Sequence, residues 1–306
     1  EAVTMVAEGL AWRAGDRVIT TVLEESPNFV PWLHLREKGV ECDVLPVTAA
    51  GTIDPARIGE AITDRTRLVA VSQVSGVLGS VIPIREIGRI CREHGTLLLV
   101  DGTHSVPRMP VDVSSLGCDF LCFAGDRMLG PTGIGVLWMK NPGPEPLYAG
   151  GGMVGTASRD GFTLAEGYQQ YEAGTPNVAG GIGLGAAADY LAGIGMERIR
   201  DHGICLTARM INGLRGLPGV KVHGPGPSDN RTGIVSFTVE GLDPRDVAVR
   251  LDEASDILVG TGHHDCQPLM EQLGLPGGTV RAGISPFTVE EEVDLLVATV
   301  AELVKG

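Results

Sequence analysis

The residues best suited to chemistry lie in two short stretches of the chain. The run from His263 to Cys266 reads His-His-Asp-Cys, and all four side chains are of types that bind metal ions. Adjacent residues on an extended segment point to opposite faces, so the four cannot reach one ion, and we predict no metal site there. Asp101 follows an apolar run, a position at which ligands collect in open α/β sheets.

The sequence also limits three other kinds of chemistry: dinucleotide binding, cysteine redox chemistry and chemistry that uses a lysine amine. The glycine-rich run 130–135 is not a dinucleotide-binding fingerprint, because its spacing is wrong and no helix follows it. Six cysteines are scattered without a CxxC pair, which predicts reduced thiols in a cytosolic protein. Chemistry that needs a lysine amine has only four candidates, namely Lys38, Lys140, Lys221 and Lys305.

The elements that position these residues alternate in type. In the first half of the chain, short β-branched runs alternate with helical patterns, which predicts a mostly parallel sheet covered by helices on both faces. Residues 1–12 already have a helical pattern, so we expect an N-terminal portion to be missing. Residues 141–175 are rich in Gly and Pro and predict long loops. The expected strands are 17–21, 42–47, 68–74, 97–100, 120–123 and 135–138.

After residue 190 a second region begins, with a strand at 233–239 and helices at 244–253 and 289–304. The sequence therefore predicts an α/β protein with a larger domain at 1–190 and a smaller C-terminal α/β domain at 191–306. The boundary is expected between residues 180 and 202, where an Ala- and Gly-rich helical stretch ends.

Composition narrows the class of partner. The chain has 306 residues, of which 43% are hydrophobic, and a formal net charge of −14. Such a charge repels phosphate backbones, so we expect no nucleic-acid or membrane partner and favour a small molecule. No apolar stretch approaches the length of about 18 residues that spans a membrane, and no signal peptide opens the chain. We predict a cytoplasmic protein.

Five strings, taken in order, resemble one known family. They are 100–107 (VDGTHSVP), 109–112 (MPVD), 130–137 (GPTGIGVL), 171–177 (YEAGTPN) and 261–264 (TGHH). Together they look like a cysteine desulfurase or selenocysteine lyase of the class V aminotransferase family. The resemblance implies a fold-type-I pyridoxal phosphate (PLP) protein with a seven-stranded, mostly parallel sheet, and a homodimer with both active sites at the interface.

The resemblance also implies roles for individual residues. Asp101 would keep the pyridine nitrogen of PLP protonated, and His104 would lie beside its phenolic oxygen. Thr175 would reach the cofactor phosphate of the neighbouring subunit. Arg281 falls where the family clamps the substrate carboxylate through two hydrogen bonds, and His264 joins it in the predicted substrate site.

The chain departs from the family at the residue that carries the cofactor. The family attaches PLP through the lysine of a Ser-Gly-His-Lys string, and the aligned residues here are Ala124, Gly125, Asp126 and Arg127. A guanidinium cannot supply the neutral nitrogen that imine formation requires. Asp126 would also repel a phosphate. The sequence therefore places PLP itself in question and allows that no cofactor is used.

Further departures gather at the same place. The His-His pair that supplies the ring-stacking imidazole becomes Glu25 and Ser26, and an Asn that contacts substrate or cofactor becomes Gly76. The family's persulfide-carrying Cys follows its second His-His pair directly, whereas here Asp265 intervenes and Cys266 comes one position late. Turn glycines and strand hydrophobics stay intact, which points to a changed function.

Removal of the cofactor would leave the Asp101 carboxylate without its partner, at a cost of several kcal/mol. We therefore predict an ion pair between Asp101 and Arg127, joined by His104, in the former cofactor space.

Three functions remain open. The first is a repurposed enzyme or binder of an amino-acid-like small molecule, with Asp101, His104, His263 and Cys266 as candidate proton-transfer or nucleophilic groups and Arg127 and Arg281 holding an anion. The second is a catalytically silent subunit that pairs with an active homologue or a sulfur-transfer partner. The third is a PLP-dependent desulfurase, lyase or epimerase that holds PLP noncovalently.

Overall fold

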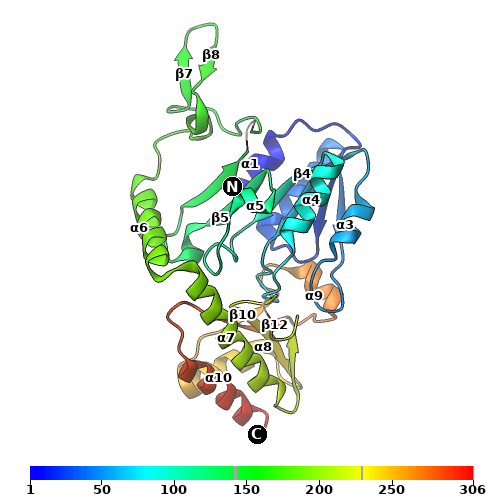
Figure 1. Cartoon of the computed structure of the whole chain (residues 1–306), viewed down its shortest axis with the longest axis vertical. Helices are drawn as coiled ribbons and strands as arrows, with labels where there is room; N and C mark the ends of the chain where they lie inside the picture. Colours follow the sequence, from blue (N-terminus) through cyan, green and yellow to red (C-terminus); the bar gives the residue numbers. More distant parts are fainter. Residues whose placement is uncertain (141–142, 229, 306) are drawn as a thin grey trace.

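The structure, a computed structural model, describes residues 1–140, 143–228 and 230–305. Its main sheet has the strand order β2-β1-β3-β4-β5-β6, in which only β6 runs antiparallel to its neighbour (Figure 1). The strands are β1 (Arg17–Thr21), β2 (Glu41–Leu45), β3 (Thr66–Ser72), β4 (Leu97–Asp101), β5 (Phe120–Ala124) and β6 (Gly135–Met139).

The expected count of seven strands was wrong, since the main sheet has six in the described part of the chain. All six β-branched runs identified from the sequence form strands, so the local pattern predicted each strand correctly. The seventh came from the family resemblance alone, and no apolar run in this part of the chain supplies it.

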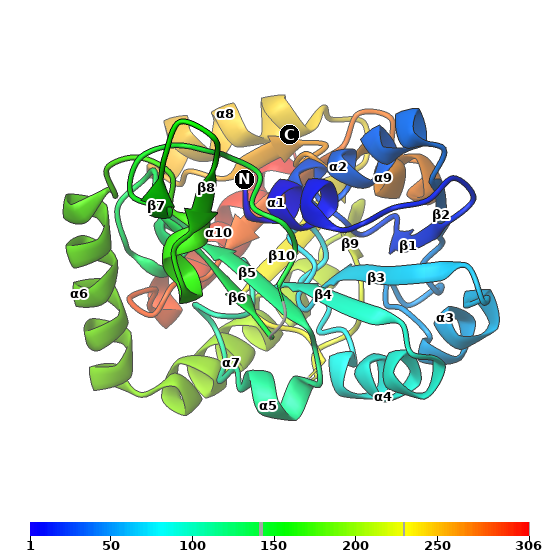
Figure 2. The same cartoon turned by 90° about the horizontal axis from the view of Figure 1, so that it is seen from above.

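Helices cover both faces of this sheet, as predicted (Figure 2). Successive strand residues point to opposite faces, so Ile19 packs into one apolar cluster and Val18 into another. The first face carries α3 (Pro55–Ala61), α4 (Ile84–His94) and α5 (Val113–Leu116). The second carries α1 (Ala2–Gly9), α2 (Val30–His34), and the 3-10 turns η1 (Ser26–Asn28) and η2 (Leu35–Lys38).

Helix α4 shows how sequence sets these boundaries. Its buried residues Ile84, Ile87 and Cys91 recur at helical spacing and face the sheet. The helix ends at Gly95, whose φ of 66° is left-handed and therefore suits a residue without a side chain. The apolar spacing and the glycine together account for the face that the helix buries and for its C-terminal end.

The C-terminal region forms a second, antiparallel sheet in the order β11-β12-β10-β9. Its strands are β9 (Val220–His223), β10 (Ile234–Val239), β11 (Gly260–Gly262) and β12 (Thr279–Gly283). A separate apolar cluster joins this sheet to α7 (Met196–Arg215), α8 (Pro244–Ser255) and α10 (Glu290–Leu303). A smaller C-terminal α/β unit is thus present.

Helix α6 (Val178–Ile194) leads from the large sheet to this second unit, and Gly195 separates it from α7. The predicted boundary at residue 190 lies inside α6 and stays a prediction. Helix α9 (Gln267–Leu273), from the later region, packs Leu269 and Met270 into the core of the large sheet. Among the described residues no single helix is long and apolar enough to span a membrane, although the bent pair α6–α7 reaches that length and composition.

The stretch predicted as loops from residue 141 is partly ordered into strands. Residues 141 and 142 lie outside the described residues, but 143–175 contain the hairpin β7 (Val154–Ala157) and β8 (Phe162–Leu164), followed by η4 (Gly167–Tyr171). The backbone N–H of Ser158 donates to the carbonyl of Gly161 and closes the hairpin turn. The hairpin projects from one end of the molecule (Figure 1).

Candidate active site

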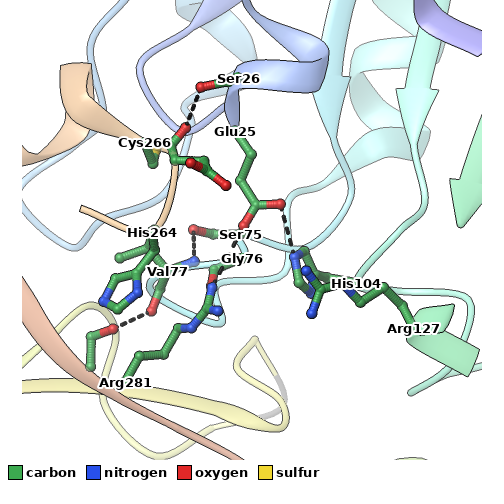
Figure 3. Close-up of polar contacts among 12 residues, drawn as sticks. Glu25, Ser26, Ser75, Gly76, Val77, His104, Arg127, His264, Cys266 and Arg281 are labelled. Carbon is green, nitrogen blue, oxygen red and sulfur yellow. Dashed lines mark hydrogen bonds and ion pairs between the residues drawn. The ribbon is translucent and has the colours of Figure 1, made fainter. Parts of the chain in front are cut away.

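Parallel strands place the site residues at one edge of the main sheet. Glu25 follows β1, Gly76 follows β3, His104 follows β4 and Arg127 follows β5, so all four come from the carboxyl ends of parallel strands. Arg281 comes from β12 of the second sheet and faces them (Figure 3).

Glu25 joins these residues through its carboxylate. His104 Nε2 lies 3.1 Å from Glu25 Oε2, and Arg281 Nη1 lies 3.6 Å from Glu25 Oε1. Burial opposes ionisation of Glu25, but the hydrogen bond from His104 and the charges of His104, Arg281 and Arg127 outweigh it and lower its pKa. Glu25 is therefore an anion, and His104 donates from Nε2.

Gly76 makes room for this arrangement. Arg281 Nη1 donates to the carbonyl of Gly76 at 2.7 Å. A β-carbon at position 76 would collide with Glu25 Oε1 and His104 Nε2. A larger residue at position 76 would therefore require Glu25 and His104 to move from the positions in which they meet.

Asp101 is buried at the end of β4, but the predicted ion pair with Arg127 is not formed between these two described residues. Asp101 Oδ1 instead accepts a hydrogen bond from the backbone N–H of Thr103 at 2.8 Å. Burial raises the pKa of Asp101, against the lowering effects of Thr103 and His104. Arg127, on the 3-10 turn η3 (Gly125–Met128), has a half-exposed side chain whose Nε lies 3.7 Å from Asp126 Oδ2.

The correction has a physical reason. The Thr103 amide and burial, which favours the protonated acid, both reduce the need of Asp101 for a cation. The positive charge of Arg127 acts on Glu25, whose pKa it helps to lower. The anion at the centre of the site is thus Glu25, which the sequence identifies only as a departure from the family's His-His pair.

Sequence reasoning also missed Arg108. Its Nη1 donates to the carbonyl of His104 at 3.3 Å, and its buried Nε has no partner among the described residues. Burial lowers its pKa to about 10, and the charges of Arg127 and Arg281 add to that effect. The only sequence signal for Glu25 was a pair of acidic residues soon after β1, and the only signal for Arg108 was its place in the turn after β4.

The segment from His263 to Cys266 is divided between different surroundings. His264 Nε2 bonds to Thr279 Oγ1 at 2.9 Å, and burial lowers its pKa to about 4, so this imidazole is neutral beside Arg281. His263 Nε2 bonds instead to the carbonyl of Pro276 at 2.8 Å. His263 also lines an open cavity of about 410 Å³ against α9.

The Cys266 thiol is fully buried and donates to the carbonyl of Val22 at 3.3 Å. Burial raises its pKa well above the ordinary value, so the thiol is neutral and has no access to the site. Asp265, whose charge supports that of Arg281, occupies the position expected for the family's Cys. No group of three potential metal ligands occurs in the part of the chain that the structure describes.

The residues present fit only part of a PLP site. Asp101 is a buried carboxyl group, the residue type that would face a protonated ring nitrogen, but the Glu25 carboxylate adds a negative charge between His104 and Arg281. Thr175 is exposed in the loop before α6, and no described contact links it to Asp101 within this chain. We find that the residues do not fit a PLP held through a lysine.

All four lysines lie elsewhere. Lys38 pairs with Glu8 on the surface, Lys140 is exposed after β6, Lys221 is on β9, and Lys305 follows α10. None is among the residues that contact Glu25, His104 or Arg281 in the described structure.

Comparison with known proteins gives one consistent answer. The family model "Aminotransferase class-V" matches residues 1–296. A probable cysteine desulfurase of Methanothermobacter thermautotrophicus is 43% identical over 99% of this chain and 77% of its own length. The apo structure of the cysteine desulfurase of Thermococcus onnurineus NA1 superposes with a TM-score of 0.95 and 38% identity, over 100% of this chain and 77% of that one.

A third match concerns a protein with an altered lysine. A lysine-to-alanine mutant of the protein C-DES, with glycine covalently linked to the PLP cofactor, has a TM-score of 0.84 and 28% identity over 98% of this chain and 78% of that one. The matches span nearly the whole chain and agree with the α/β architecture. The chain therefore belongs to the class V aminotransferase family, as a cysteine-desulfurase-like member.

Proposed function

We propose that this protein forms no lysine-linked PLP imine and instead binds an amino-acid-like small molecule where its relatives hold their cofactor, either as a binder or as a repurposed enzyme. The observation that supports this proposal is the Glu25 carboxylate, which lies between His104 at 3.1 Å and Arg281 at 3.6 Å. A site that contains this carboxylate and the Arg281 guanidinium, but no lysine amine, is suited to binding the charged groups of a small molecule through ion pairs rather than through an imine.

The chain's own residues supply two capacities. Arg281 provides a partly buried guanidinium for a ligand carboxylate. His104 offers its second ring nitrogen, because Nε2 is engaged with Glu25 and Nδ1 is buried without a partner in the described structure. Cys266 and His263, also predicted from the sequence as site residues, take no part in the proposed chemistry. The Cys266 thiol is buried against the carbonyl of Val22, and His263 is bonded to the carbonyl of Pro276.

A PLP titration of the purified chain tests the proposal. Absorbance is followed, and the mixture is then reduced with borohydride and analysed by mass spectrometry, with the Methanothermobacter relative treated in parallel as positive control. We expect no PLP adduct on any lysine, because none contacts the site residues. A reduced adduct on one of the four lysines would overturn the proposal.

A variant in the same assay tests the alignment of Arg127 with the missing lysine. The double substitution Arg127→Lys with Glu25→His supplies both an amine and an aromatic ring where the resemblance places them. We expect a borohydride-stable adduct confined to this variant, and Glu25→His alone is the matched control. An adduct equal in both would contradict the alignment.

One alternative has a specific observation in its favour. The lysine-to-alanine mutant of C-DES holds PLP linked to glycine, so a relative without that lysine still carries the cofactor. If this chain bound PLP noncovalently, the titration would give an absorbance change without a protein-bound adduct after reduction.

Assembly with a second subunit is part of the proposal. Helix α6 exposes Val178, Ile182 and Tyr190, and Thr175 lies just before it. Exposed apolar side chains gathered on one element indicate an interaction surface. We propose a homodimer, or a heterodimer with a homologue as a silent subunit would form, in the cytoplasm, where the six free cysteines would stay reduced.

A further inference from the structure

Glu25 has hydrogen-bonding capacity that its present partners do not use. Its Oε2 accepts from His104 at 3.1 Å, whereas its Oε1 lies 3.6 Å from Arg281 Nη1, beyond hydrogen-bond range. The shared ion pair holds the carboxylate in place and leaves Oε1 able to accept from another donor.

Arg281 has spare capacity on the other side. A guanidinium carries five N–H donors, and the described residues take one hydrogen bond from Arg281, to the carbonyl of Gly76. A ligand carboxylate can therefore bind Arg281 without displacing Glu25. His104, one of the buried polar residues, fixes the position of Glu25 from the opposite side.

An unpaired acceptor and unused guanidinium donors thus lie side by side and carry opposite charges. An α-amino acid presents an ammonium and a carboxylate on one carbon, which matches this pair of groups. A simple carboxylate satisfies only Arg281 and brings a second anion close to Glu25, which like-charge repulsion disfavours.

We infer that Glu25 Oε1 receives the ammonium of a free, zwitterionic α-amino acid whose carboxylate binds Arg281. Glu25 is then the residue that selects amino acids over simple carboxylates. The inference rests on the proposed function and deepens it, because it replaces covalent capture of the amine with an ion pair.

Calorimetry on the full chain tests this selection with matched pairs of probes. L-alanine is compared with propionate, and L-cysteine with 3-mercaptopropionate, so that each pair differs by the ammonium alone. We expect the wild type to bind at least one amino acid about tenfold or more tightly than its partner. This comparison needs no variant and holds whether or not a substitution folds.

Variants then assign the selection to Glu25. Glu25→Gln should weaken amino-acid binding about tenfold and leave the simple carboxylates unchanged or tighter. Glu60→Gln is the matched control, because Glu60 on α3 is an exposed carboxylate that forms an ion pair with Arg57 on the surface. This variant should bind all four probes as the wild type does.

Two other outcomes are distinguishable. In the first, propionate binds the wild type as tightly as L-alanine does, and Glu25→Gln strengthens the binding of both. Glu25 would then compete with the ligand carboxylate for Arg281 instead of binding the ammonium, so the inference would fail while the proposed function would stand. If no probe binds the wild type or Glu25→Gln, the proposed function fails, and the inference with it.

Discussion

The pKa values of two adjacent carboxyl groups, Glu24 and Glu25, shift in opposite directions because the groups have different partners. Glu24 is buried and accepts hydrogen bonds from Thr21, Asn28 and Ser72, which are neutral groups. Burial therefore dominates and raises its pKa from 4.5 to about 7. Glu25 has cations around it, which outweigh burial and lower its pKa. Glu24 is therefore part of a buried hydrogen-bond network, whereas Glu25 is the negative charge of the candidate site.

Glu24 makes folding stability depend on pH. Between pH 4.5 and about 7 the native state keeps a proton on Glu24 that the unfolded chain has released, so stability falls as pH rises through this window. The contribution lost is about 3 kcal/mol. Urea unfolding at pH 5, 6 and 7 measures it.

The substitution Glu24→Gln isolates this effect. Glutamine keeps one acceptor for Asn28 and Ser72 and can donate to Thr21, but it does not titrate. We expect the variant to lose less stability than the wild type between pH 5 and 7. Equal losses in the two proteins would contradict the role given to Glu24.

Among the elements, helix α8 gives two predictions of opposite sign: a substitution at its first turn should lower the stability of the protein, and one after its last turn should raise it. Asp243 Oδ1 accepts from the backbone N–H of Arg245 at 2.8 Å and caps the first turn, so Asp243→Ala should destabilise the protein by about 1 kcal/mol. Asp256 follows the last turn with a left-handed φ of 53°, so Asp256→Gly should stabilise it by up to about 1 kcal/mol. Thermal unfolding of both variants checks the signs, and shifts in one direction would refute the assignment.

Elements were predictable from sequence because their signals are local. The strand runs and the glycine stop of α4 depend on residues close together in the chain. The sequence also predicted, from the family resemblance, that the residues around the cofactor differ here. It could not show the contact of Glu25 with His104 and Arg281, because these residues meet only when β1, β4 and β12 have assembled. A wrong partner was therefore assigned to Arg127.

At the scale of the molecule, the exposed apolar side chains of α6 predict self-association. Ile182 is 71% exposed, a large apolar area for a chain that acts alone. We expect the wild type to sediment as a dimer and Ile182→Glu to weaken the dimer about tenfold or more. Leu258→Glu, at an 83% exposed leucine after α8, is the matched control and should not change the mass. A monomeric wild type would remove the dimer proposal.

The bare α-carbon at Gly76 makes positions 25, 76 and 104 depend on one another. A β-carbon there would meet Glu25 Oε1 and His104 Nε2, so a larger residue at 76 requires these two side chains to shift. Substitutions at the three positions are therefore expected to have non-additive effects.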